Sequence, residues 1–172
     1  MTVWLINGIS GAGKTTTARA LAKRLPKAAH VEGDLVQDLI VAGGVWPGQE
    51  PGDEAIRQIH LCIRNQCALA RAFEHEGFVT VIDYVIVNRA RVEEYKSQLG
   101  GCEVHLVTLA PGVDVALERD ALRDKQVAGF WTHLDAEIRR ELLGTGLWID
   151  NALLGVDEVV DHILVAGESA RV

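Results

Sequence analysis

No apolar run in this chain of 172 residues approaches the length of about 20 residues that a membrane-spanning helix needs. Positive charge is also in short supply, because 17 Lys and Arg stand against 24 Asp and Glu, a formal net charge of −7. Nucleic acids are held mainly by clustered Lys and Arg, so this balance argues against a nucleic-acid partner. The first residues lack the cationic start and cleavage site of a secretory signal, and we expect a cytoplasmic protein with no membrane association.

Cysteine is scarce, and its spacing excludes familiar metal sites. Cys62, Cys67 and Cys102 form an odd set without ligand spacing, which favours buried free thiols. The six histidines are scattered, so a structural zinc site is not expected. Repeats, low-complexity tracts and linkers are missing as well. With 48% hydrophobic residues, the whole span 1–172 is expected to form one domain with an adequate core.

What the sequence does contain is a complete phosphate-binding loop, Gly-Ile-Ser-Gly-Ala-Gly-Lys-Thr, at residues 8–15. The apolar run 3–6 before it suits a buried strand, and apolar residues at helical spacing follow it. Gly8, Gly11 and Gly13 allow backbone conformations closed to other residues, so that N–H groups turn inward around a phosphate. The alternative is an ordinary Gly-rich turn between a strand and a helix, which rarely fills every position of the motif.

Each residue of the loop has an expected role toward Mg²⁺ and ATP, the cofactors that we expect. Lys14 would reach the β- and γ-phosphates, the Thr15 hydroxyl would ligate Mg²⁺, and Thr16 would touch the α-phosphate. The main chain would line the phosphates at Gly8, Ser10, Gly11, Ala12 and Gly13.

Strand-like segments alternate with helical ones along the rest of the chain. After the first strand, we expect strands over 28–31, 78–87, 104–109 and 147–149. Helices are expected over 14–25, 34–42, 53–76 (capped by Asp53), 88–99 (capped by Asn88), about 112–123, 133–143 and 156–164. This order predicts an α/β protein with the three-layer P-loop NTPase fold: a five-stranded parallel sheet, helices on both faces and a small helical lid at about 119–133.

Acidic side chains follow two of the predicted strands, at the edge of the sheet where ligands bind. Asp34, after Glu32 and Gly33, is placed to accept a proton from a substrate hydroxyl or to orient that hydroxyl. The alternative is that Asp34 caps the next helix, but its place beside a phosphate-binding loop favours the functional interpretation. Glu32 either holds Mg²⁺ through water or faces solvent. Asp83 either anchors Mg²⁺ or is an inward polar residue at a bend, because apolar residues continue after it.

Arginines and one tryptophan are the remaining candidates. Arg119 and Arg123 lie four residues apart, so one helix face can present both to a transferring phosphate. The alternative is a solvated helix in which acidic neighbours pair with them. Arg57 belongs to a stripe of arginines typical of a solvated face, but its place near a loop suits contact with an anionic substrate. Trp46, in a loop rich in Gly and Pro, is a plausible wall of a substrate pocket.

Together these residues resemble the small phosphate-loop kinases that include gluconate kinase, shikimate kinase and chloramphenicol phosphotransferase. The nearest resemblance is to uncharacterised bacterial proteins described as gluconate-kinase-like or AAA-type ATPases. Glu32-Gly33-Asp34, Asp83-Tyr84 and the segment 119–123 carry it. The resemblance implies that Asp34 activates the acceptor hydroxyl, that Tyr84 contacts the acceptor, and that Asn151 lies beside adenine. It also implies that Arg119 and Arg123 act from a lid.

The sequence therefore predicts an ATP-dependent kinase that transfers the γ-phosphate to a hydroxyl of a small molecule, a metabolite or an antibiotic, and that acts as a monomer or homodimer. A nucleoside or nucleotide acceptor stays open. So does a regulatory ATPase or switch with a protein partner. An Asn-Lys-x-Asp segment of GTPases and a Ser-Gly-Gly signature of ABC-type ATPases are both missing.

Overall fold

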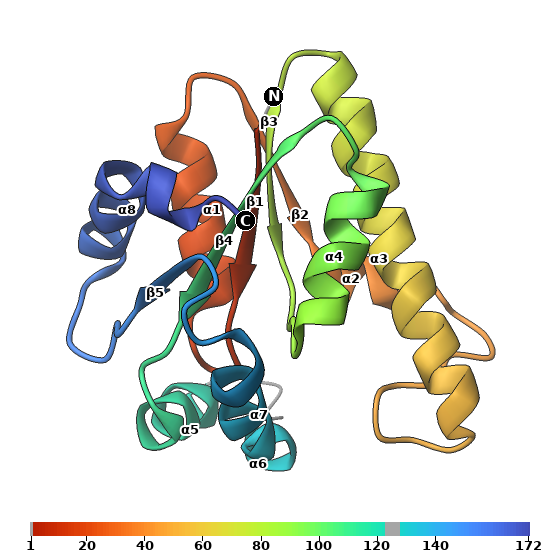
Figure 1. Cartoon of the computed structure of the whole chain (residues 1–172). Helices are drawn as coiled ribbons and strands as arrows, with labels where there is room; N and C mark the ends of the chain where they lie inside the picture. Colours follow the sequence, from red (N-terminus) through yellow and green to blue (C-terminus); the bar gives the residue numbers. More distant parts are fainter. Residues whose placement is uncertain (1, 123–127) are drawn as a thin grey trace.

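The computed structural model describes residues 2–122 and 128–172. Figure 1 shows one twisted layer of strands between two groups of helices. The strands are β1 (Thr2–Asn7), β2 (Ala28–Glu32), β3 (Val79–Asp83), β4 (Glu103–Leu109) and β5 (Leu147–Ile149). Neighbouring strands pair in parallel in the order β2-β3-β1-β4-β5. The predicted α/β class and five-stranded parallel sheet are thus confirmed.

Helices cover both faces of this sheet and one of its ends (Figure 1). They are α1 (Lys14–Arg24), α2 (Gly33–Asp38), α3 (Gly52–His75), α4 (Arg89–Gln98), α5 (Val113–Ala121), α6 (Ala128–Trp131), α7 (His133–Leu142), α8 (Val156–Val165) and the 3₁₀ turn η1 (Gly167–Ala170). Helices α1 and α8 pack together on one side, and α3 and α4 on the other. Helices α5 to α7 gather beyond the carboxyl ends of the central strands.

The core explains why the central strands show no alternation of apolar and polar residues. Val3 to Ile6 of β1 are all buried, and so are Val104 to Leu109 of β4. A parallel sheet covered on both faces has no solvent side, so the two-residue alternation of an exposed strand is absent. None of the helices in the described parts of the chain is both long and apolar enough to span a membrane.

Strand β3 ends earlier than the sequence predicts, at Asp83 instead of Val87. The side chain of Asn7 explains this, because its Oδ1 accepts a hydrogen bond from the main-chain N–H of Ile86 at 2.8 Å. Tyr84 still donates its main-chain N–H to Ile6 of β1 at 3.2 Å, but two residues later the partner of the main chain is the Asn7 side chain. The apolar character of residues 84–87 reflects burial outside the sheet, and Asp83 stands at a strand end, not at a bend within a strand.

The helix boundaries show two further differences. Helix α2 stops at Asp38 rather than at residue 42. Leu39 and Val41, which follow Asp38, are exposed, so no packing extends the helix over them. Helix α3 starts after Pro51, so Asp53 lies in its first turn and is not its cap. The predicted cap of α4 is confirmed, since Asn88 accepts from the N–H of Arg91 at 3.0 Å.

Candidate functional site

The phosphate-binding loop joins β1 to α1 and lies tightly against the end of β4 and against α5. Gly8, Gly11 and Gly13 have φ angles of 143°, 82° and 94°. A Cβ on Gly11 would lie 2.1 Å from the main-chain oxygen of Ala116, and one on Gly8 would lie 2.6 Å from that of Leu109. Side chains at these positions would displace the loop, so its shape depends on glycine.

Two side chains of the loop, Lys14 and Thr15, make polar contacts within the protein. Lys14 Nζ donates to the main-chain oxygen of Ile9 at 3.2 Å, which places the ammonium over the loop. Thr15 Oγ1 donates to Asp83 Oδ2 at 2.8 Å. Because the hydroxyl proton points to Asp83, the oxygen lone pairs of Thr15 are left for a cation. Hydroxyl and carboxylate oxygens are the donors that Mg²⁺ prefers, so this pair fits the ion.

His30 is a site residue that sequence reasoning missed. Its Nε2 lies 2.6 Å from Asp83 Oδ1. In the sheet register Glu32 pairs with Asp83, so His30, two residues earlier on β2, points to the same face. The sequence could have indicated this, because side chains two residues apart on a strand point to the same face, so His30 shares a face with Glu32.

The segment after β5 is bonded to the phosphate-binding loop. Asn151 Nδ2 donates to the main-chain oxygen of Ala12 at 2.9 Å. Its Oδ1 is buried and has no hydrogen-bond partner among the described residues. Arg119 Nη2 donates to the main-chain oxygens of Asn151 and Ala152. Arg119 therefore contacts the segment predicted to lie beside adenine.

The other residues predicted near the nucleotide are less constrained. Ser10 is half-buried within the loop, and Thr16 is exposed. Thr15 and Thr16 line one end of an open cavity of about 410 Å³ between α1 and the start of α8. Arg123, the second predicted lid arginine, lies outside the described residues.

Asp34 is exposed in the first turn of α2, directly after the end of β2. The residue in the cap position is Glu32, so the alternative interpretation of Asp34 as the helix cap is wrong. The charge of Asp34 contributes to a raised pKa of Tyr84, whose main cause is burial of the phenol. A Cβ on Gly33 would lie 2.4 Å from Tyr84 Cδ2, so the chain before Asp34 rests on the Tyr84 ring.

A series of buried polar side chains from α3 and α4 contacts the start of α2 at Gly33. Cys62 Sγ lies 3.5 Å from the main-chain oxygen of Gly33 and accepts from Gln66 Nε2 at 3.1 Å. Tyr95 donates its hydroxyl to Gln66 Oε1. These contacts join α3 and α4 to the start of α2, which limits the freedom of the backbone that carries Asp34.

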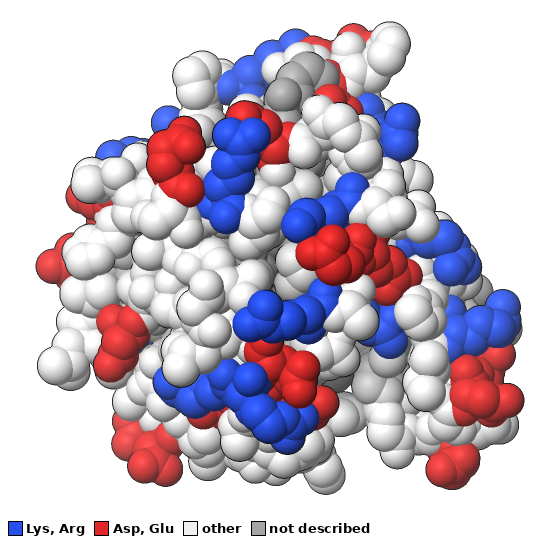
Figure 2. All heavy atoms as spheres, in the orientation of Figure 1, with Lys and Arg blue, Asp and Glu red and all other residues white. Residues whose placement is uncertain are grey.

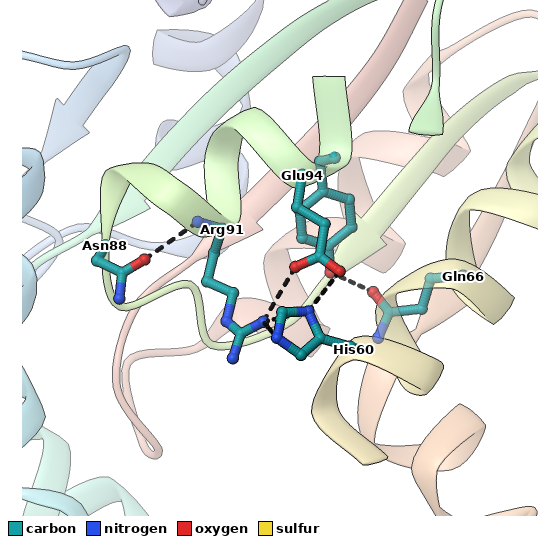
Figure 3. Close-up of polar contacts among 6 residues, drawn as sticks. His60, Gln66, Asn88, Arg91 and Glu94 are labelled. Atoms are coloured by element: carbon teal, nitrogen blue, oxygen red, sulfur yellow. Dashed lines mark hydrogen bonds and ion pairs between the residues drawn. The ribbon is translucent and has the colours of Figure 1, made fainter. Parts of the chain in front are cut away.

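Figure 3 shows a second link between α3 and α4, close to the first turn of α4. Glu94 Oε1 lies 2.7 Å from His60 Nδ1, and Glu94 Oε2 accepts from Arg91 Nη1 at 3.0 Å. Asn88, which caps α4, lies beside Arg91 in this view. The carboxylate thus contacts both the His60 imidazole and the Arg91 guanidinium, and these contacts hold α3 and α4 together.

The loop before α3 contacts α6. Trp46 is half-buried in this loop, and the Gln58 side chain anchors it by bonding the N–H of Val45 at 2.7 Å and the oxygen of Gly43 at 2.8 Å. A Cβ on Gly48 would lie 3.1 Å from the Trp131 ring of α6. Trp131 thus packs against the loop that carries Trp46.

Arg57 is exposed, and its guanidinium is paired within its own helix. Its Nε and Nη2 donate to the two carboxylate oxygens of Glu54 at 2.7 and 2.8 Å. The hydrogen bond from Arg57 is the main reason that the pKa of Glu54 is lowered to about 2. The structure therefore brings Arg57 to Glu54, not to Asp34 or Tyr84.

The surface around the site carries both signs of charge. Figure 2 shows Lys and Arg interleaved with Asp and Glu on this face, without a continuous basic field. The lower edge of this face is notched between the part that carries α5 to α7 and the part that carries α3.

Comparisons with known proteins identify the family of the chain. The adenylyl-sulfate kinase of a Picosynechococcus species is 33% identical over 108 residues, which are 58% of this chain and 54% of that protein. This chain thus spans about half the length of that relative. The solved tunicamycin resistance protein of Deinococcus radiodurans is 28% identical, with a TM-score of 0.67 over 97% of this chain and 94% of that one.

A sugar kinase from a Janibacter species shares only 18% identity, yet it superposes with a TM-score of 0.72 over 98% of this chain and 95% of that one, which shows the same fold. The family model for the AAA domain AAA_33 matches residues 3–138, which contain the loop, Asp34, Asp83 and Arg119. The chain therefore belongs to the AAA_33 family of AAA domains, among the small phosphate-loop kinases.

Proposed function

We propose that this protein is an ATP-dependent kinase that transfers the γ-phosphate of ATP to a hydroxyl of a small molecule. The observation that carries the proposal is that the phosphate-binding loop, Asp83 and Asp34 lie at the ends of three adjacent strands, β1, β3 and β2. Asp83 pairs with Ile6 of β1 on one side and with Glu32 of β2 on the other. The phosphate-binding loop and Asp34 therefore flank the Asp83–Thr15 pair at one edge of the sheet.

On the donor side, the loop N–H groups and the α1 dipole hold phosphate oxygens. Mg²⁺·ATP, when bound, supplies the transferable phosphoryl group and part of its charge neutralisation. The Lys14 ammonium exchanges the oxygen of Ile9 for phosphate oxygens. Thr15, with its proton directed to Asp83, presents its oxygen to the cation. Arg119 and Asn151 hold the segment beside the base, and Arg123 acts from the lid.

On the acceptor side, the Asp34 carboxylate orients the attacking hydroxyl and accepts its proton as the new O–P bond forms, while ADP leaves. Its exposure on a short helix leaves room for an acceptor above it. Trp46 and Tyr84 form the nearby walls. Closure of the lid side against the loop before α3 would exclude water and limit hydrolysis.

The relatives support this class of reaction and widen the set of acceptors to test. One is a kinase of adenylyl sulfate, a nucleotide, which keeps a nucleotide acceptor open. The other is a resistance protein against tunicamycin, which supports an antibiotic acceptor. Both compounds therefore belong in an acceptor panel.

The test is ADP release from Mg²⁺·ATP with sugar acids, polyols, nucleosides, adenylyl sulfate and tunicamycin. Asp34→Asn is compared with Asp38→Asn, an exposed aspartate one turn later on the same helix. We expect one acceptor class to accelerate ADP release. Asp34→Asn should lower that rate by about 100-fold or more, as loss of a general base does, and Asp38→Asn should not. Equal rates for the two variants, or ADP release that no acceptor increases, would contradict the proposal.

A further inference from the structure

We propose that His30 is a positioning residue for the divalent cation: it holds the Asp83 carboxylate so that Thr15 presents its oxygen, not its proton, to the ion. The inference rests on the proposed nucleotide site and goes beyond it, because neither the loop motif nor the acid at the end of β3 calls for a histidine on β2.

The two oxygens of Asp83 are divided between two partners. Oδ1 lies 2.6 Å from His30 Nε2, and Oδ2 accepts from Thr15 Oγ1 at 2.8 Å. Since a carboxylate oxygen accepts, the Nε2 atom carries the proton of this hydrogen bond. A carboxylate bonded at both oxygens cannot turn about its χ2 angle without breaking both contacts.

Burial makes this arrangement effective. The side chains of His30 and Asp83 are 12% and 4% exposed, so water is a poor substitute for either partner. Both side chains lie on the same face of the sheet, as the pairing of His30 with Val81 and of Glu32 with Asp83 requires. Helix α1, which carries Thr15, packs against β3. The three groups therefore form a line from β2 through β3 to the first turn of α1.

The consequence concerns the Thr15 hydroxyl. While Asp83 Oδ2 accepts its proton, the Thr15 lone pairs face away from Asp83 and are available to a cation. If Oδ1 lost its donor, the buried carboxylate would turn to regain a partner, and the hydroxyl would no longer be fixed. Groups that orient a metal ligand in this way typically change metal affinity by about 10- to 100-fold when removed.

Direct measurement of cation binding tests this without any acceptor. Mn²⁺ replaces Mg²⁺ in titrations with ADP, and bound Mn²⁺ is followed by electron paramagnetic resonance. We expect His30→Ala to weaken Mn²⁺ binding in the ADP complex by about 10-fold or more, with binding of ADP without metal nearly unchanged. His30→Gln should restore most of the affinity, because its amide nitrogen reaches the position of Nε2. His30→Asn should not, because it is too short.

His105→Ala is the matched control. His105 is buried in β4, pairs with Trp4, and its Nδ1 lies 2.9 Å from the main-chain oxygen of Gly167. Like His30→Ala, the substitution His105→Ala removes a buried imidazole and one hydrogen bond. It should nevertheless leave the Mn²⁺ affinity unchanged. Wild-type affinity in His30→Ala, an equal loss in His105→Ala, or no rescue by His30→Gln would overturn the inference. A wild-type protein that binds neither ADP nor Mn²⁺·ADP would overturn the proposed function as well.

Discussion

Arg119 donates from one nitrogen to the main-chain oxygens of Asn151, at 2.8 Å, and Ala152, at 3.1 Å. The Asn151 side chain in turn donates to the main-chain oxygen of Ala12 in the phosphate-binding loop. These contacts join the end of α5, the segment after β5 and the loop into one hydrogen-bonded unit. A change at Arg119 should therefore reach the nucleotide through the segment that Asn151 begins.

Arg119→Ala should weaken ATP binding more than it slows turnover. Loss of a charged donor to two carbonyl oxygens is expected to raise the KM for ATP by about 10-fold, equivalent to about 1.4 kcal/mol. At saturating ATP, kcat should change little if Arg119 holds the base segment. Steady-state kinetics check this, with the exposed Arg140→Ala as control. A large fall in kcat at an unchanged KM would instead place Arg119 on the transferring phosphate.

Gly33→Ala should destabilise the fold. Its Cβ would lie 2.4 Å from Tyr84 Cδ2 and 2.9 Å from the main-chain oxygen of Asp83, and both of these residues are buried. Such overpacking costs about 1–3 kcal/mol in the free energy of unfolding, measured by urea denaturation. Gly129→Ala is the control, because its Cβ would meet nothing within 4 Å. Equal midpoints for the two variants would show that the turn before Asp34 is looser than its contacts indicate.

The three cysteines should react slowly with a thiol reagent at pH 8 in the folded protein. Burial raises the pKa of Cys62 to about 11 and of Cys67 to about 12, so both remain protonated thiols at that pH. Burial also raises the pKa of Cys102, but this residue is only half-buried and should react first. Peptide mapping after timed labelling identifies each site. Rapid labelling of Cys62 in the folded state would contradict its burial.

Arg57→Ala should change the Glu54 carboxyl group and leave the acceptor KM almost unaltered. Without its main hydrogen bond, the pKa of Glu54 should rise from about 2 toward 4.5, and the bond from Gln58 should keep the rise incomplete. Carboxyl NMR titration measures this change. Both groups are on the surface, so we expect little effect on stability. A tenfold higher acceptor KM would support the original expectation that Arg57 binds an anionic acceptor.

The elements with strong local signals were predicted closely. Strand β5 has the predicted bounds, and Asn88 caps α4, because an apolar run and an N-cap act over a few residues. Predictions failed where burial had another cause. The apolar residues after Asp83 extended the predicted strand. In the structure, however, the main-chain N–H of Ile86 bonds to the Asn7 side chain and not to a strand. Helix α6, four residues long, has too short a pattern to be recognised.

The sequence by itself determined the phosphate-binding loop and the alternation of strands and helices, because both depend on local backbone freedom and on periodic burial. Tertiary structure decided the strand order and the contacts between distant residues. His30 meets Asp83 across 53 positions in sequence, and Arg119 meets Asn151 across 32. Such pairs form only when parallel strands bring their carboxyl ends to one edge. The physical reason is that hydrogen bonds between distant side chains follow from packing, which no short stretch of sequence specifies.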